Sequence, residues 1–216
     1  MKQDIAVIGL GIFGHEVAVA LEEKGNHVLA VDIDKNEIDR IRDHVTAAVV
    51  ANVRESEALK ELGIDKFDLI ILGLGDNFEE MVLGITYLRK LGAQHIIARA
   101  TTEIQQEILL RIGADEVILP EKQSARHLAE RITVPNILEY LELDEEINLA
   151  EIHVDEKLAG KTLLELDLRK KFNITVLILK RNGQKPKVIT SPELTLMQDD
   201  YLVVVGSQQD IEKVFA

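Results

Sequence analysis

Short runs of β-branched and apolar residues alternate with longer amphipathic stretches along the first 132 residues. Each short run predicts a strand buried on both faces of a parallel sheet, and each longer stretch predicts a helix that connects two strands. Strands are predicted at residues 5–8, 27–31, 47–51, 68–72, 95–98 and 116–119. Helices are predicted after residue 14 and at residues 37–43, 54–62, 77–91, 102–112 and 121–132. This alternation predicts an α/β fold, a Rossmann-like doubly wound parallel sheet whose ligand crevice lies at the carboxyl ends of the strands.

The joints between these helices and the following strands share one residue type. A glycine stands at each of them: Gly25, Gly63, Gly92 and Gly113. We expect each to adopt the left-handed conformation that ends a helix and turns the chain into the next strand.

The pattern changes after residue 148. Apolar and polar positions alternate at residues 150–154, and further strands are predicted at 174–179, 188–189 and 201–205. Helices are predicted at 162–168 and 208–215. These elements predict a separate α+β module of about 70 residues, which is small enough to depend on dimerisation for part of its core.

Residues 132–146 are predicted to join the two modules. Residues 133–136 end the last helix of the first module, residues 137–143 carry an apolar stripe, and residues 144–146 form a charged run. The stripe would pack on its own domain or on a second subunit, and we favour the subunit. The predicted domains are residues 1–135, for nucleotide binding, and residues 136–216, for ligand binding and dimerisation.

The first predicted strand leads directly into a G-x-G-x-x-G motif, GLGIFG, at residues 9–14. Gly9 permits the tight turn from strand to helix, Gly11 lets the backbone approach a pyrophosphate, and Gly14 lets the helix lie against the sheet. The second strand ends at Asp32, where a carboxylate is placed to accept hydrogen bonds from the ribose hydroxyls of an adenosine. The same carboxylate would repel a 2′-phosphate, so NADP is not expected.

Further polar residues stand where the other predicted strands end. Asn52 follows the third strand, the segment 73–77 with Gly73 and Asp76 follows the fourth, and Arg99 ends the fifth. Asn52 would read an adenine edge or cap a helix, and Asp76 would contact a ligand or cap a helix. Arg99 is suited to phosphate oxygens, and its alternative is a salt bridge to a carboxylate.

Composition narrows the functional classes. The formal net charge of −13 lies in the first 150 residues, which predicts no binding to nucleic acid and no direct binding to anionic lipid. The chain lacks cysteine, its six histidines show no metal-ligand spacing, and no residues resemble a catalytic set. No apolar run approaches the roughly 20 residues of a membrane span, and no signal-like segment opens the sequence, so we expect a cytoplasmic protein.

These residues together resemble the RCK (regulator of K⁺ conductance) family of cytosolic regulatory subunits of bacterial Ktr/Trk-type potassium uptake systems. The resemblance covers essentially the whole chain. It rests on the segments 6–14, 31–32, 51–52, 112–115, 120–122, 166–172 and 203–206. It implies a TrkA-N domain that binds ADP, ATP or NAD(H), followed by a TrkA-C domain. It also implies dimers that assemble into a larger ring, such as an octamer, and gate a membrane potassium-translocating subunit, at which the protein is peripheral.

By position, the resemblance implies that Asp32 holds ribose, Asn52 adenine and Arg99 phosphate. It implies that Glu121 binds a cation such as Mg²⁺ or Ca²⁺ near the phosphates of two facing subunits. Ile12 and Phe13, in the same loop, are also expected at the nucleotide. Ile12 departs from the pattern of the family, because many ATP-responsive members have arginine at this position and an isoleucine cannot reach a terminal phosphate.

The second module holds a basic run, Arg169 to Lys171, which makes a local positive patch in an acidic protein. The resemblance implies a cyclic di-AMP site there, with Arg169 on a phosphate and Asn173 or Thr175 on a base or phosphate. The alternative is that the run offsets a helix dipole and stays in water. For the whole chain, a small NAD-dependent oxidoreductase remains the alternative to a regulatory subunit.

Overall fold

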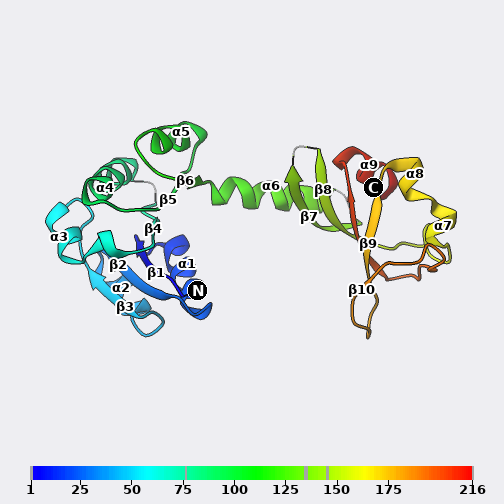
Figure 1. The fold of residues 1–216 in the computed structure, drawn as a ribbon, viewed down its shortest axis with the longest axis horizontal. Coiled ribbons are helices and arrows are strands. Elements are labelled where there is room, and N and C mark those ends of the chain that lie inside the picture. The colour runs from blue at the N-terminus through cyan, green and yellow to red at the C-terminus, as the bar shows by residue number, and fades with distance from the viewer. Residues whose placement is uncertain (1, 76, 134–135, 145, 216) are drawn as a thin grey trace. The chain divides into compact units, whose positions relative to one another are not determined.

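The computed structural model describes residues 2–75, 77–133, 136–144 and 146–215 (Figure 1). The chain divides into two compact units, Met1–Lys122 and Gln123–Ala216. Asp76, one of the predicted site residues, lies outside the described residues.

The sheet of the first unit confirms the predicted doubly wound topology. Its six described strands pair in parallel in the order β3-β2-β1-β4-β5-β6. They are β1 (Asp4–Ile8), β2 (His27–Asp32), β3 (Ala47–Val50), β4 (Leu69–Leu72), β5 (Ile96–Arg99) and β6 (Glu116–Ile118). From β1 the chain adds β2 and β3 on one side, and then returns to add β4, β5 and β6 on the other side. A ligand crevice is expected at this switch point, at the carboxyl ends of β1 and β4.

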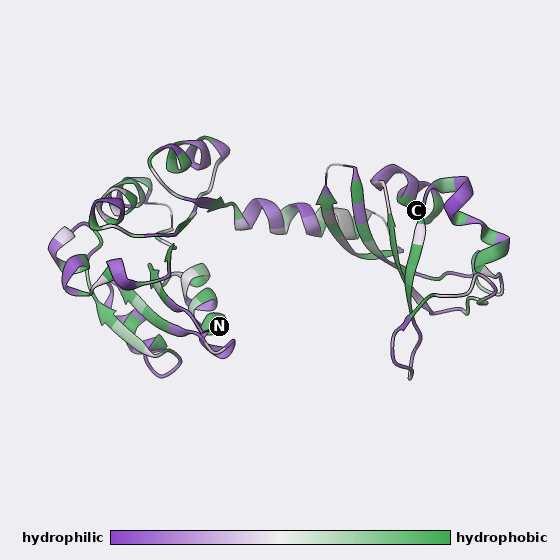
Figure 2. Ribbon diagram, viewed as in Figure 1, coloured by the Kyte–Doolittle hydropathy of each residue, from purple (hydrophilic) through white to green (hydrophobic). Residues whose placement is uncertain are grey.

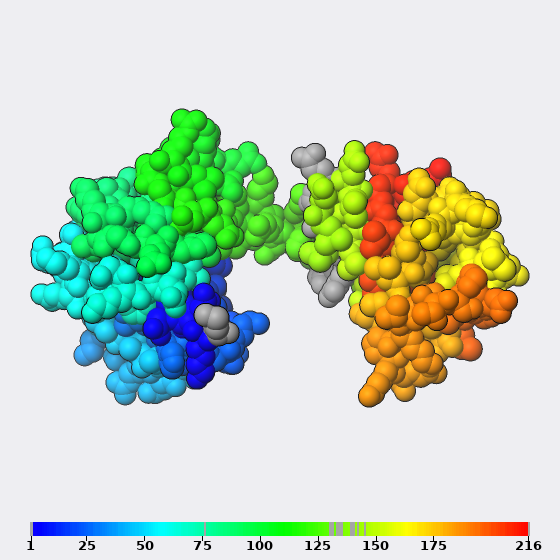
Figure 3. All heavy atoms as spheres, in the orientation of Figure 1, coloured from blue at the N-terminus to red at the C-terminus, as the bar shows by residue number. Residues whose placement is uncertain are grey.

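Helices lie on both faces of this sheet. They are α1 (Ile12–Glu23), α2 (Lys35–Ile41), α3 (Ser56–Glu61), α4 (Phe78–Leu91), α5 (Glu103–Arg111) and the start of α6 (Pro120–Thr133), with a 3₁₀ turn at Ile64–Lys66. The four glycines at the joints have the predicted positive φ angles, 88°, 65°, 92° and 120° in chain order. In the space-filling view, α5 stands out at the surface of the unit (Figure 3).

The residues of β1 show why its apolar run forms a strand covered on both faces. Ile5 and Val7 belong to a buried cluster with residues of α1 and α2. Ala6 and Ile8 point the other way, into a cluster with residues of α3, α4 and α5. Because side chains alternate across a strand, a run without polar residues fits only where both faces are covered. The hydropathy colouring shows the same apolar strands within more polar helices (Figure 2).

The second unit is an antiparallel sheet with short helices. Its described strands pair in the order β10-β9-β11-β8-β7. They are β7 (Ile137–Asp144), β8 (Ile147–His153), β9 (Thr175–Lys180), β10 (Lys187–Val188) and β11 (Tyr201–Gly206). The helices are α7 (Leu163–Leu166), α8 (Leu168–Phe172) and α9 (Gln208–Phe215). One core cluster joins the three helices to β7, β8, β9 and β11, and this confirms the predicted α+β module.

The interpretation of residues 137–143 as part of a linker is wrong. They form β7, which pairs with β8 along its length. The pairing shifts register between Ile137 and Glu139 and again between Glu142 and Asp144. These irregularities break the period-2 alternation from which a strand is recognised in a sequence. The structure thus assigns the apolar stripe to an edge strand, where Leu141 and Leu143 are exposed.

The helix predicted at residues 162–168 is two short helices. Asp167 has a φ of 46° and separates α7 from α8. Thr162 caps α7 in a capping box with Glu165. The basic run Arg169–Lys171 therefore lies within α8, whose last turn it forms.

Candidate nucleotide-binding site

The glycine motif forms a tight turn at the carboxyl end of β1. A Cβ atom at Gly9, whose φ is 91°, would lie 2.8 Å from the carbonyl carbon of Gly73. A Cβ atom at Gly14 would lie 1.8 Å from the carbonyl oxygen of Gly9. These two glycines are therefore required by the packing of the protein on itself. At Gly11, by contrast, no described heavy atom lies within 4 Å of the corresponding position, so this face of the loop is open.

The first turn of α1 begins at this open face. Within the described residues, no side chain caps the helix at Gly11 and no acidic residue lies in its first turn. The free N–H groups and the positive end of the helix dipole are therefore available to an anion. Ile12, the first helical residue, is 91% exposed. Phe13 follows it and lines the cavity that is described below.

Asp32 is fixed beside the loop by two backbone hydrogen bonds. Its Oδ2 accepts from the N–H of Leu10 at 2.6 Å, and its Oδ1 accepts from the N–H of Asp34 at 2.8 Å. Each carboxylate oxygen has a second lone pair, which neither backbone group uses. The side chain is thus held in place and still able to accept from two neighbouring hydroxyl groups.

A cavity of about 250 Å³ lies at the carboxyl ends of β1 to β5. Seven of the predicted site residues line it: Gly9, Gly11, Phe13, Asp32, Asn52, Gly73 and Arg99. Ile12, Gly14 and Glu121 are outside its lining. Leu74 and Gly75, which also line it, belong to the predicted segment 73–77. The prediction did not include five others: Ile8, Ile33, Ala51, Val53 and Glu80. Most of these five are neighbours of predicted residues, but Glu80 comes from the first turn of α4.

Arg99 is the cation of this cavity. Its side chain is 15% exposed, and its Nη2 donates to Oε1 of Glu121 at 2.6 Å. Its Nε is buried and has no hydrogen-bond partner among the described residues. An unpaired buried donor costs about 1–3 kcal/mol, which an anion in the cavity would recover. The ion-pair alternative and the ligand role are therefore both compatible with the geometry of Arg99.

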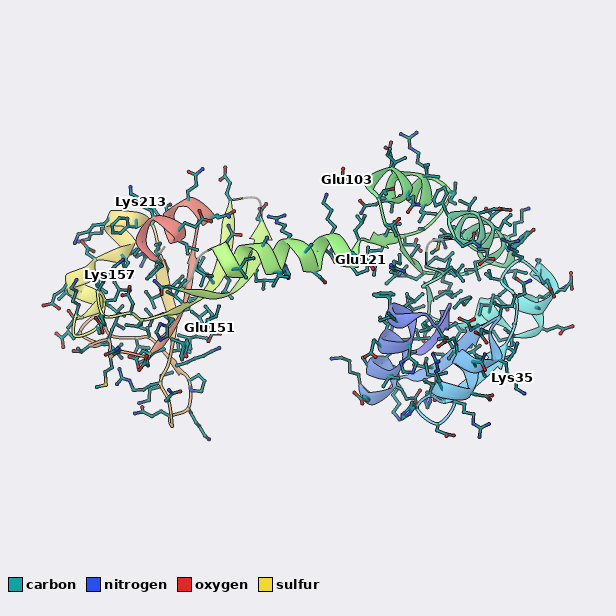
Figure 4. The ribbon with its side chains drawn as sticks, turned by 180° about the vertical axis from the view of Figure 1, so that it is seen from behind. Lys35, Glu103, Glu121, Glu151, Lys157 and Lys213 are labelled. Atoms are coloured by element: carbon teal, nitrogen blue, oxygen red, sulfur yellow. The ribbon has the colours of Figure 1, made fainter. Side chains whose placement is uncertain are left out.

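Glu121 lies at the start of α6, where Figure 4 labels it together with Glu103 of α5. The hydrogen bond from Arg99 lowers the pKa of Glu121. The next residue, Lys122, pairs with Glu103. Among the described residues, no group of three or more carboxylates or histidines is arranged to hold a metal ion. The cation role of Glu121 stays a prediction.

Asn52 lines the cavity, but its side chain is engaged locally. Its Oδ1 accepts from the N–H of Arg54 at 3.0 Å, and its Nδ2 donates to Oε1 of Glu55 at 3.3 Å. Glu55, rather than Asn52, is the N-cap of α3. Asn52 therefore closes the turn before the helix, and one N–H and one oxygen lone pair of its amide remain for a ligand.

The second unit has a cavity of about 680 Å³ at the N-terminal end of α9. Asn173, with a φ of 55°, and Thr175 line it. Arg169 is outside the lining, so the structure brings together two of the three residues predicted for cyclic di-AMP. The role of all three stays a prediction.

Sequence comparison places this site in a known family. The TrkA-N domain model matches residues 5–120, and the TrkA-C domain model matches residues 149–216. The chain is 39% identical over 215 residues to Ktr system potassium uptake protein C of Bacillus subtilis, covering 99% of this chain and 96% of the relative. The chain belongs to the Ktr potassium uptake family. This confirms the resemblance to Ktr/Trk systems.

Other members of the Ktr family match over similar lengths. Ktr system potassium uptake protein A of Bacillus subtilis is 33% identical over 212 residues, covering 98% of this chain and 95% of the relative.

In the described part of the chain, no helix has the length and apolar character needed to cross a membrane.

Solved structures share the fold at lower identity. The crystal structure of the GsuK RCK domain has a TM-score of 0.68 and 18% identity, and the match covers all of this chain but only 47% of that one. The Kef C-terminal domain of Shewanella denitrificans, in an AMP-bound form, has a TM-score of 0.53 and 21% identity, with 61% and 81% covered. At this identity the likeness establishes the fold and leaves the ligand of this chain to be argued from its own residues.

Proposed function

We propose that this chain is a cytosolic, nucleotide-sensing regulatory subunit that gates a membrane potassium-translocating subunit. The observation that carries the proposal is the cavity at the carboxyl ends of β1 to β5, which is lined by a fixed carboxylate, a guanidinium with an unpaired Nε and an open helix N-terminus. It stands in a chain that belongs to a potassium uptake family.

The ligands that suit this cavity are the adenine nucleotides ADP and ATP, and NAD(H). The two remaining lone pairs of Asp32 match the two adjacent ribose hydroxyls, while a 2′-phosphate would meet a carboxylate. Phosphate groups would lie at Gly11, against the free N–H groups of α1. Arg99 would then give its unpaired Nε to a phosphate oxygen.

Nucleotide binding would act on α6 through the ion pair of Arg99 and Glu121. A phosphate that accepts from Nε would share the charge of Arg99 with Glu121, so occupancy would weaken the ion pair between Arg99 and the first turn of α6. Because α6 leads from the first unit into the second, this contact couples the cavity to the helix that connects them. Regulation follows only if nucleotides bind two arrangements of the subunit with different affinity.

Assembly into a dimer and a larger ring, such as an octamer, is supported by large apolar side chains that are exposed on two helices. On α5, Ile104 is 72% exposed and Ile108 is also exposed, one turn further along. On α6, Leu128 and Ile132 are exposed with the same spacing. Residues four apart share one face of a helix, so each helix offers an apolar stripe to another subunit.

The regulatory role is proposed over that of an NAD-dependent oxidoreductase because the relatives that match the full length are named potassium uptake proteins. We expect bound NADH to remain unconsumed with a panel of carbonyl substrates. The cyclic di-AMP site at Arg169, Asn173 and Thr175 stays a prediction for the second unit.

The nucleotide site is tested by titration calorimetry with ADP, ATP and NADH on Asp32→Asn. An amide cannot accept the two backbone N–H groups and two hydroxyls together, so we expect affinity to fall by about tenfold or more. Asp34→Asn is the matched control, since the carboxylate of Asp34 caps α2 by accepting from the N–H and Nδ2 of Asn36 and is outside the cavity lining. Equal affinity of Asp32→Asn and the unmodified protein would contradict the ribose assignment.

A further inference from the structure

Glu80 places a carboxylate in the cavity that the glycine motif and the resemblance do not account for. It comes from the first turn of α4, which is held by Asn77, whose Oδ1 accepts from the N–H of Glu80 at 3.2 Å. Its side chain is 27% exposed and forms part of the cavity wall.

The neighbours of Glu80 identify the end of the cavity at which it lies. Four residues further along α4, on the same helical face, a Cβ atom at Gly84 would lie 3.1 Å from Cγ2 of Val53. Oε1 of Glu80 lies 3.0 Å from Nε of Arg54, the residue after Val53. The face of α4 that carries Glu80 therefore packs on the segment that follows β3.

This end of the cavity is where a base would lie. In the strand order β3-β2-β1-β4-β5, Asp32 ends β2, Gly11 follows β1 and Arg99 ends β5. The segment after β3 therefore lies beyond Asp32, at the opposite end of the cavity from Gly11 and Arg99. With ribose at Asp32 and phosphates at Gly11, the base extends towards Val53. This step rests on the proposed function, namely that the cavity binds a nucleotide.

The chemistry of Glu80 selects one kind of base edge. Asn52, which follows β3, uses one donor and one acceptor of its amide on Glu55 and Arg54. A carboxylate only accepts hydrogen bonds, and the ion pair with Arg54 uses one of its oxygens. We propose that Glu80 is the base-selecting residue of this site: it accepts from the 6-amino group of adenine, and it would repel the oxygen that a 6-oxo purine presents at the same position.

Arg54 is a positioning residue in this scheme. Its guanidinium holds the carboxylate of Glu80 at the base end, and Arg54 itself is outside the cavity lining. A purely structural ion pair between the segment after β3 and α4 would affect all nucleotides equally. Base selection affects the ratio of their affinities.

The test compares ADP with IDP, which carries a 6-oxo group in place of the 6-amino group, by titration calorimetry on the full chain. We expect the unmodified protein to bind ADP at least about tenfold more tightly than IDP. In Glu80→Gln the amide can turn to donate to the oxo group, so this preference should fall to near unity. Glu79→Gln, a neighbouring exposed residue outside the cavity lining, should keep the preference.

Arg54→Gln provides a second variant that leaves the carboxylate in place, and we expect it to reduce the preference for ADP. An unchanged ratio of ADP to IDP affinity in Glu80→Gln would overturn the inference, as would ADP binding without preference in the unmodified protein. If the unmodified protein bound no adenine nucleotide, the proposed function itself would fall, and the inference with it.

Discussion

At the scale of the residue, Asp200 is a buried carboxylate on which part of the second unit depends. It is 1% exposed, and its two oxygens accept from Nε and Nη2 of Arg181, each at 2.7 Å. Its Oδ2 also accepts from the N–H of Met197 at 2.8 Å. Burial opposes ionisation of Asp200, but the hydrogen bonds from Arg181 and Met197 outweigh it and lower the pKa.

We therefore expect Asp200→Asn to lower the free energy of unfolding of the second unit by about 3–5 kcal/mol, because Arg181 loses its partner. Asp199→Asn, whose exposed carboxylate contacts His153, is the control and should change little. Urea denaturation followed by circular dichroism measures both. Equal stability of the two variants would show that the buried pair is dispensable.

The same residue gives a pH dependence with a definite sign. A carboxyl group whose pKa is lower in the folded state contributes stability above its unfolded pKa, about 3.9, and this contribution is lost as the pH falls towards the folded value. The difference in stability between the unmodified protein and Asp200→Asn should therefore be full near pH 7 and shrink below about pH 4.

At the scale of the element, the turn from β1 into α1 separates glycines required for folding from one required for binding. Gly14→Ala would drive a methyl group into the carbonyl oxygen of Gly9, so α1 must move and both stability and nucleotide binding should fall. Gly11 has a φ of −58°, which alanine adopts, and an open face. Gly11→Ala should keep its thermal unfolding temperature within a few degrees and bind nucleotide more weakly.

Thermal unfolding and calorimetry on the two variants check this contrast. Normal nucleotide affinity in Gly11→Ala would mean that the phosphates lie elsewhere. An unchanged unfolding temperature in Gly14→Ala would contradict the close contact of α1 with β1.

Elements that depend on neighbouring residues were predictable from the sequence, and those that depend on distant packing were not. The glycine motif, Asp32 and the glycines at the helix ends are specified locally, by strand, turn and helix in succession. Glu80 enters the site only because α4 packs against Val53, a contact that depends on the order of strands in the sheet. The strand β7 escaped recognition because its register shifts conceal the alternation of its side chains.

At the scale of the whole molecule, the prediction of two modules is confirmed, and the position of their boundary at residues 135 and 136 stays a prediction. The two compact units meet at Lys122 and Gln123, within α6, while the second sheet begins at Ile137. A helix shared between two units is continuous in the sequence pattern, so the pattern alone does not reveal where one unit ends. This helix also carries Glu121, the partner of Arg99.

The central claim is that nucleotide occupancy of the first unit controls potassium movement through a membrane partner. The most direct measurement is potassium flux into vesicles that contain a Ktr-system membrane subunit and this chain, with ADP, ATP or NADH. We expect the flux to differ among the three nucleotides, and we expect Asp32→Asn to abolish the difference while Asp34→Asn preserves it. Identical flux with all three nucleotides and without any nucleotide would contradict the claim.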